Sequence, residues 1–127
     1  MKIIHRDGLV FTTIEIMYAD RKKVIENVAI DTAATCTLIS PDSVADIGLE
    51  YELVDQLGID YGIGGHRHAF KKQVDWIRCG PFCVGPLNLG FGNIDPNGNI
   101  NGLLGLDLLL EAGAVIDLKN LLLYEGT

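Results

Sequence analysis

The stretch of sequence that decides the fold is Ala29-Ile30-Asp31-Thr32-Ala33-Ala34-Thr35. Its acid follows the end of an apolar strand, and small and hydroxyl residues follow the acid before the chain becomes apolar again at Leu38. A carboxylate at such a position costs free energy unless it is hydrogen-bonded or used in chemistry. One interpretation is a turn in which Asp31 and Thr32 bond the local backbone. The other is a functional acid, and this stretch alone leaves both open.

Two further glycine-containing motifs follow along the chain. The first, Gly62-Ile63-Gly64-Gly65, precedes a long predicted strand, which is typical of a flexible hairpin whose backbone comes close to something extended. A phosphate-binding loop would open a helix and usually carries a lysine, so that interpretation is disfavoured. The second, Gly102-Leu103-Leu104-Gly105, places two aliphatic residues before a glycine and a predicted helix.

The remaining pattern predicts a mainly β protein with two short helices. Period-two alternation, bounded by turn residues, indicates a hairpin and several further strands. Proline or N-cap signals and following glycines indicate the helices. The predicted strands cover residues 9–18, 24–30, 67–79, 87–91, 114–118 and 121–124, and the predicted helices cover residues 41–47 and 106–112.

Composition sets the class of protein. The chain has 127 residues, 48% hydrophobic and 21% charged, which predicts one folded domain over residues 1–127. Its net charge of −7 disfavours nucleic acid and anionic membranes as partners. The sequence contains no apolar run long enough to predict a membrane span or a secretory signal, so we expect a cytoplasmic protein. The three cysteines, Cys36, Cys79 and Cys83, are expected to be reduced and to bind no zinc.

Taken in order, the three motifs resemble those of the retropepsin-like aspartic proteases, the single-lobe relatives of pepsin. The resemblance covers nearly the whole chain and implies the acid protease fold, a closed or partly open β-barrel lobe. It implies that Asp31 is the catalytic aspartate and that the Thr32 hydroxyl bonds across to a partner subunit's loop. It implies no metal and no cofactor. The remaining implied site residues are the active-site loop Ala33, Ala34 and Thr35, the substrate-binding flap Gly62, Ile63, Gly64 and Gly65, and the second loop Leu103, Leu104 and Gly105.

The chemistry of peptide hydrolysis agrees with this resemblance. Two carboxylates about 3 Å apart cannot both ionise, so they share a proton and supply both a base for water and an acid for the substrate. The chain has one such aspartate motif, so the second carboxylate must come from another copy across a two-fold axis at Asp31. We therefore expect a homodimeric peptidase that cleaves extended peptides. The alternative is a catalytically silent module of the same fold that binds peptides or dimerises. The apolar tail, residues 121–124, could form the dimer interface or complete the subunit's own sheet.

Some positions depart from the family pattern. Ala33 replaces the family's glycine, and its methyl group costs little if the backbone φ is negative. Ala34 replaces a frequent serine or threonine, and Thr35 and Cys36 replace acids that hold the substrate's ends in retroviral members. Asp107 is expected to cap the helix that follows it.

The other polar candidates favour structural roles. The sequence indicates no third metal ligand beside His66 and His68. It also indicates no base that would activate the Cys36 thiol. Trp76 is expected in the core or at the dimer surface.

Overall fold

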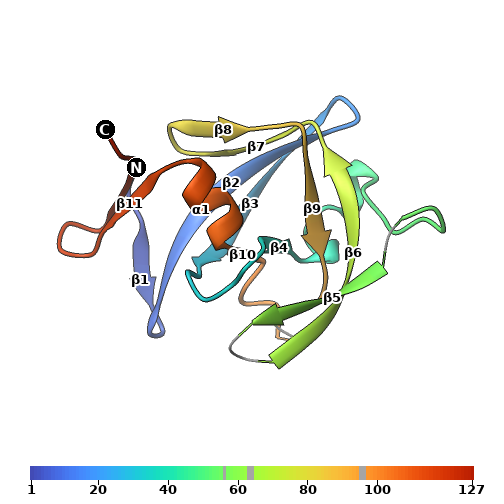
Figure 1. Ribbon diagram of the computed structural model, residues 1–127, viewed down its shortest axis with the longest axis horizontal. Helices are drawn as coiled ribbons and strands as arrows, with labels where there is room; N and C mark the ends of the chain where they lie inside the picture. The colour runs from blue at the N-terminus through green and yellow to red at the C-terminus, as the bar shows by residue number, and fades with distance from the viewer. Residues whose placement is uncertain (56, 63–64, 95–96) are drawn as a thin grey trace.

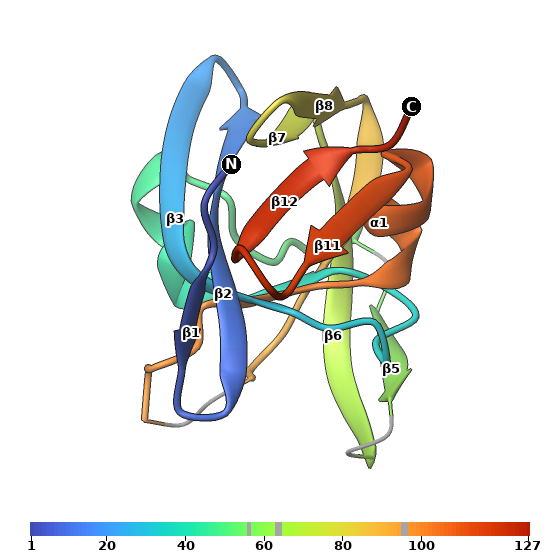
Figure 2. The ribbon, with the colours of Figure 1, turned by 90° about the vertical axis from the view of Figure 1, so that its left-hand side faces the viewer.

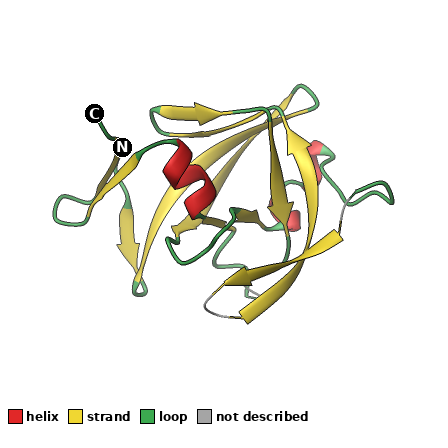
Figure 3. Cartoon of the chain, viewed as in Figure 1, coloured by secondary structure: helices red, strands yellow, loops and turns green. Residues whose placement is uncertain are grey.

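The computed structural model describes residues 1–55, 57–62, 65–94 and 97–127 of the chain (Figure 1). Strands dominate it, with a single short α-helix and two 3-10 turns among the described residues (Figure 3). The elements in chain order are β1 (Ile4–Arg6), β2 (Leu9–Tyr18), β3 (Arg21–Ile30), β4 (Leu38–Ile39), η1 (Pro41–Ser43), η2 (Ala45–Ile47), β5 (Leu57–Gly62), β6 (Gly65–Val74), β7 (Trp76–Cys79), β8 (Phe82–Val84), β9 (Leu87–Phe91), β10 (Gly102–Leu104), α1 (Leu106–Glu111), β11 (Ala114–Asp117) and β12 (Leu122–Glu125).

One curled sheet forms the body of the molecule. Its strand order is β5-β6-β9-β4-β10-β3-β2-β7-β8, and β1 pairs with β2 beside this path. Most neighbours are antiparallel, but β10 runs parallel to β3 and β4 runs parallel to β9. These parallel pairings bring the end of β3 and the end of β10 to the same edge, with Leu104 opposite Ile30. The residues that follow the two strands therefore emerge side by side.

The β2–β3 hairpin confirms the first sequence prediction. Its turn consists of Ala19 and Asp20, which have φ values of 49° and 64°. Two successive residues at positive φ match the type I′ geometry that suits the twist of a hairpin. The second strand begins at Arg21, earlier than predicted, because a two-residue turn leaves the polar residues 21–23 inside the strand.

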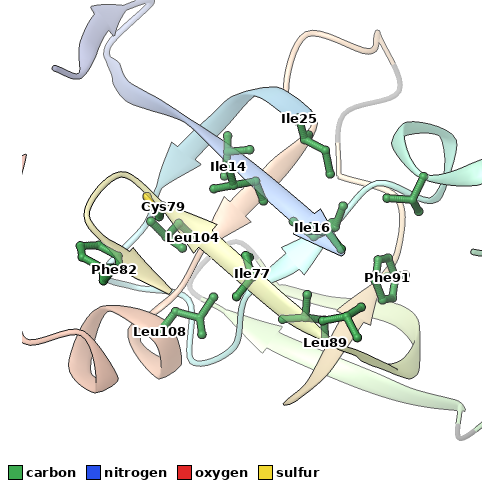
Figure 4. Packing of buried hydrophobic residues seen from close by; sticks show 14 of the residues in the cluster. Ile14, Ile16, Ile25, Ile77, Cys79, Phe82, Leu89, Phe91, Leu104 and Leu108 are labelled. Carbon is green, nitrogen blue, oxygen red and sulfur yellow. The ribbon is translucent and has the colours of Figure 1, made fainter. Parts of the chain in front are cut away.

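The main core lies inside the curl of the sheet (Figure 4). Alternate residues of β2 point into it, and Ile14 and Ile16 are 1% and 0% exposed. A smaller cluster of Phe11, Ala29 and Leu103 forms a row across β2, β3 and β10. Because side chains alternate along strands, this row lies on the opposite face of the sheet from Val28 and Leu104.

The first predicted helix, over residues 41–47, is wrong in type. The segment forms the 3-10 turns η1 and η2 instead. Val44 between them has φ −124° and ψ 0°, and this conformation interrupts the helical backbone after one turn. Gly48 then ends the segment in the left-handed region at φ 79°, as a glycine after a helical turn commonly does. The second predicted helix is present as α1, followed by Gly113 at φ 58°.

The long extended stretch predicted over residues 67–79 is divided in two. Asp75 separates β6 from β7, and its amide donates to the Met17 carbonyl oxygen over 2.9 Å. Gly80 and Pro81 end β7, as predicted, but they also form a two-residue turn into β8, which the sequence did not indicate. Strand β9, predicted over residues 87–91, is confirmed.

The terminal segments form a small sheet of their own (Figure 2). Strands β11 and β12 pair with each other, and residues 1–3 lie along the other edge of β12. The Ile3 amide donates to the Leu121 carbonyl, and the Leu123 amide donates to the Met1 carbonyl. Strand β12 thus completes the subunit's own sheet. Strand β11 was predicted to be buried but is partly exposed, because this sheet covers the core with one face only.

Among the described residues, no helix has the length and apolar character needed to cross a bilayer.

Candidate active site

Asp31 lies immediately after β3, at the edge where β3 and β10 end together. Its amide donates to the Leu104 carbonyl oxygen over 2.9 Å, which continues the parallel ladder by one residue. The carboxylate is partly buried, and its Oδ1 accepts a hydrogen bond from the Ala33 amide at 3.0 Å. The Asp31 carbonyl in turn accepts from the Ala34 amide at 3.1 Å. The backbone therefore fixes where this carboxylate stands.

These bonds bear on the two interpretations of Asp31. The Ala33 bond is the local turn bond that the structural interpretation predicts. It uses one oxygen, however, and no other donor in the described part of the chain binds the carboxylate. The Asp31 carboxylate also forms no ion pair within the described residues. The turn thus orients the acid and leaves its second oxygen available for chemistry.

The second loop packs directly against the Asp31 loop. A methyl group built on Gly105 would come within 2.7 Å of the Cys36 carbonyl carbon and 2.9 Å of the Ala34 carbonyl oxygen. Both neighbours are backbone atoms, so only glycine allows this approach. Leu103 and Leu104, the other residues predicted for this loop, belong to β10 and are buried at 6% and 0% exposure.

Helix α1 extends the contact between the two loops. The Leu106 amide donates to the Ala34 carbonyl at 2.9 Å, and the Asp107 amide donates to the Thr35 carbonyl at 3.3 Å. The first amides of a helix have no partner within the helix, and here the Asp31 loop supplies their acceptors. Three predicted site residues, Ala34, Thr35 and Gly105, are brought together in this way.

Asp107 and Thr37 form a link that the sequence analysis missed. Gly105, rather than Asp107, is the N-cap residue of α1. Asp107 Oδ1 accepts from the Leu108 amide in the first turn of the helix at 2.8 Å, which agrees with the predicted capping role, and also from the Thr37 amide at 2.9 Å and the Thr37 hydroxyl at 2.7 Å. The Thr37 hydroxyl also accepts from the Gly105 amide at 3.0 Å. The role of Asp107 is structural, as predicted, and it also acts between the two loops.

The exposed part of the Asp31 loop consists of Thr32, Ala33 and Thr35, whereas Ala34 is buried at 4% exposure. Among the described residues, positive φ at non-glycine positions is confined to Asp7, Ala19, Asp20, Asn27 and Leu121. Ala33 therefore has a backbone that any residue adopts. The replacement of the family's glycine at this position introduces no backbone strain.

The predicted flap corresponds to the β5–β6 hairpin, which we call the β5–β6 arm. Its last paired residues are Gly62 and Gly65, and Figure 1 shows it extending from the body of the molecule. Ile63 and Gly64, the predicted tip, lie outside the described residues. No backbone hydrogen bond among the described residues joins the arm to the Asp31 loop.

The remaining polar candidates are the three cysteines, Trp76 and two histidines. Cys36, Cys79 and Cys83 are free thiols, and burial raises the pKa of the Cys79 thiol. Trp76 is partly buried, with the Arg78 guanidinium 4.7 Å from the centre of its ring. The side chains of His66 and His68 lie outside the described part of the structure. Within that part, no cluster of three or more His, Cys, Asp or Glu side chains could hold a metal ion.

Comparison with known proteins agrees with this geometry. A family described as aspartyl protease matches residues 14–108, a span that contains the Asp31 loop, the β5–β6 arm and the second loop. The match covers well over half of the chain, and the chain belongs to the aspartyl protease family, as its resemblance to the retropepsin-like members predicts. A comparison with curated proteins gave no match.

Proposed function

We propose that the protein is a homodimeric aspartic peptidase in which the two Asp31 carboxylates, one from each subunit, activate a water molecule against an extended peptide. The single observation that carries this proposal is the placement of Asp31. Two parallel strands and the packed second loop hold the residue, while one carboxylate oxygen has no donor in the described part of the chain. Family membership supports the same class of reaction.

The chemistry follows from a pair of carboxylates that share one proton. The ionised member takes a proton from water as the water oxygen attacks the peptide carbonyl carbon, and the protonated member gives its proton to the carbonyl oxygen. Collapse of the tetrahedral intermediate returns a proton to the amide nitrogen and breaks the carbon–nitrogen bond. The pair acts in its singly protonated form, so we expect activity at mildly acidic pH.

A second subunit is required because the sequence carries one aspartate motif of this kind, at Asp31. The exposed Thr32 is free to reach the partner's loop, in the role that the resemblance implies. Both edges of β12 are occupied within the subunit, by β11 and by residues 1–3. A dimer contact at this sheet would therefore use β11, where Val115 and the cross-strand Tyr124 are 36% and 42% exposed.

The substrate would lie between the Asp31 loop and the β5–β6 arm. We assign Gly62, Ile63, Gly64 and Gly65 to the flap that covers the peptide, because glycines permit a hinge and a close backbone approach. The three free thiols support a reducing, cytoplasmic location.

The decisive variant is Asp31→Asn. Asparagine Oδ1 can still accept the Ala33 amide bond, so we expect a folded dimer without peptidase activity. Activity is measured on a peptide library, and association is measured by sedimentation over a range of protein concentrations. A variant that retained wild-type activity would refute the assignment of Asp31.

Mixing the two chains tests the shared site. Wild-type and Asp31→Asn chains are mixed in equal amounts and allowed to exchange subunits. The mixture should have about one quarter of the activity of wild-type protein at the same total chain concentration, because only wild-type homodimers carry both acids. A value near one half would mean that each subunit works alone. A folded wild-type protein that dimerises but cleaves no peptide would favour the alternative, a silent peptide-binding module.

A further inference from the structure

Lys72 occupies a core-facing position on β6. Its neighbours on the same face, Phe70 and Val74, are 8% and 1% exposed, and Lys72 itself is 8% exposed. A lysine is almost never buried to this extent unless its ammonium group is paired. The partners of Lys72 therefore indicate what the residue does.

Both partners come from the turn that precedes β5. Lys72 Nζ lies 2.9 Å from Asp55 Oδ2 and 3.1 Å from Glu52 Oε1. The turn is closed by two further bonds, from the Glu52 amide to Asp55 Oδ2 at 2.8 Å and from the Asp55 amide to the Glu52 carbonyl at 2.9 Å. From β2, the ring of Tyr18 faces the same ammonium group, 6.0 Å from its centre.

Ionic contacts, rather than burial of its central apolar side chains, hold this turn in place. Leu53 and Val54, at the centre of the turn, are 94% and 89% exposed. A further side-chain contact is at Tyr51, whose ring lies 5.6 Å from that of Phe70, again on β6. Residues 51–55 are thus attached to β6 at two successive core-facing positions, Phe70 and Lys72.

The attachment lies where the β5–β6 arm leaves the body of the molecule. Phe70 pairs with Leu57 of β5 on one side and with Phe91 of β9 on the other. From Phe70 to Val74, β6 pairs with β9 of the body, whereas from Phe70 back to Gly65 it pairs with β5 alone (Figure 1). Lys72 is two residues inside this junction, and Asp55 is two residues before β5 begins.

We propose that Lys72 is a positioning residue for the β5–β6 arm: by binding Glu52 and Asp55 it fixes the chain that leads into β5 and sets the orientation of the arm relative to the Asp31 loop. The effect of Lys72 on catalysis rests on the proposed function, in which the arm contacts the substrate. The effect of Lys72 on the orientation of the arm is independent of that function.

We call the contacts of Lys72 with Glu52 and Asp55 the Lys72 clamp. The charges of its Lys72–Asp55 pair persist under the conditions of peptide cleavage. Burial alone would lower the pKa of the Lys72 ammonium group, but the hydrogen bonds to Asp55 and Glu52 outweigh it and raise the pKa. Burial likewise favours a higher pKa for Asp55, but the Glu52 amide and Lys72 outweigh it and lower the pKa. The Lys72–Asp55 pair therefore loses one of its charges only below the ordinary pKa of an aspartate, 3.8, or above that of a lysine, 10.5.

Hydrogen exchange tests the clamp without any substrate. In Lys72→Met, amides of residues 57–62 and 65–69 should exchange about fivefold faster than in the wild type, while amides of β2 and β3 stay unchanged. The matched control is Lys23→Met, which removes the lysine of the Lys23–Asp46 pair, on β3 rather than β6, and should leave the arm unchanged. Unchanged exchange in the arm of Lys72→Met would overturn the proposal.

Peptide cleavage tests the positioning role. Lys72→Met should raise KM about fivefold with a smaller change in kcat, because the arm is misplaced before substrate binds. Adding Asp55→Asn should restore part of the loss, and Lys72→Arg should retain most of the activity.

The outcomes separate the two proposals. An active wild type with a looser arm but unchanged KM in Lys72→Met would overturn the positioning role and leave the proposed function intact. A looser arm in a protein that cleaves no peptide would support the clamp and remove the proposed function. If Lys72→Met does not fold, Asp55→Asn in the wild-type background gives the same test, and no change in arm exchange there overturns the proposal.

Discussion

Ala33 is the residue at which this chain departs most from its family's pattern. Its backbone lies outside the positive-φ region that favours glycine, and its side chain is exposed within the subunit. The methyl group therefore costs nothing in the isolated fold. Any effect of this methyl group on catalysis must come from its contact with a partner subunit or a bound peptide.

Ala33→Gly should lower the free energy of unfolding by about 0.5–1 kcal/mol, because glycine gives the unfolded chain more conformations to lose. Urea denaturation measures this as a lower midpoint with an unchanged slope. Ala34→Gly is the matched control and should cost more, since the Ala34 methyl is 4% exposed and its burial is lost as well. A more stable Ala33→Gly variant would show that the alanine backbone is strained.

Asp107 and Thr37 join the two loops of the site across 70 residues of sequence. Thr37 is 1% exposed, and every buried polar side-chain atom in the described part of the chain has a partner. The two bonds from Thr37 to Asp107 Oδ1 are the reason that this threonine can be buried so completely. Loss of the acceptor would leave the hydroxyl hydrogen and the amide of Thr37 without this acceptor, while the hydroxyl oxygen would still accept from Gly105.

Asp107→Ala should therefore lower the free energy of unfolding by about 1–3 kcal/mol. Asp107→Asn keeps an oxygen at the Oδ1 position and should lose less than half of that amount. Thermal or urea unfolding of the two variants measures the difference, and no substrate is needed. Equal losses in both variants would mean that the negative charge, rather than the acceptor geometry, is what matters.

The strands and turns differ in how far the sequence could predict them. The β2–β3 hairpin, β9 and α1 carry strong periodicity or glycine stops, and each was predicted close to its observed position. Strand β8 has only three residues, Phe82–Val84, too few for a periodic pattern. The η1–η2 segment was predicted as one helix because its caps are helical, but Val44 adopts a non-helical conformation between them.

The site was predictable where its chemistry is local in sequence. Asp31 and Gly105 stand in short motifs of the sequence, and the structure places them directly after the paired strands β3 and β10. Lys72 was not predictable, because adjacent Lys71 and Lys72 are chemically alike and only the pleat of β6 decides which one points inward. Its partners Glu52 and Asp55 reach it through tertiary packing alone. The same holds for the bond between Thr37 and Asp107.

The charge of the whole molecule sets its expected response to acid. The net charge is −7, and three aspartates have a lowered pKa in the folded chain. For Asp46 the main cause is its hydrogen bond with Lys23, and for Asp117 it is the hydrogen bond from the Asn120 side chain. For Asp55, the Glu52 amide and Lys72 outweigh a burial effect of opposite sign. Near pH 4 the folded chain therefore binds fewer protons than the unfolded chain.

These three aspartates should consequently make the free energy of unfolding fall steadily below about pH 4. A lowered aspartate pKa contributes stability above its unfolded value, and that contribution is lost as the pH falls through the folded value. Lys72, with a raised pKa, loses its contribution only in the alkaline range. Urea denaturation at pH 7, 5 and 3 measures the profile, and the double variant Asp46→Asn, Asp117→Asn should show a shallower decline in acid. Greater stability at pH 3 than at pH 5 would contradict this account, because the folded chain would then have to bind more protons than the unfolded one.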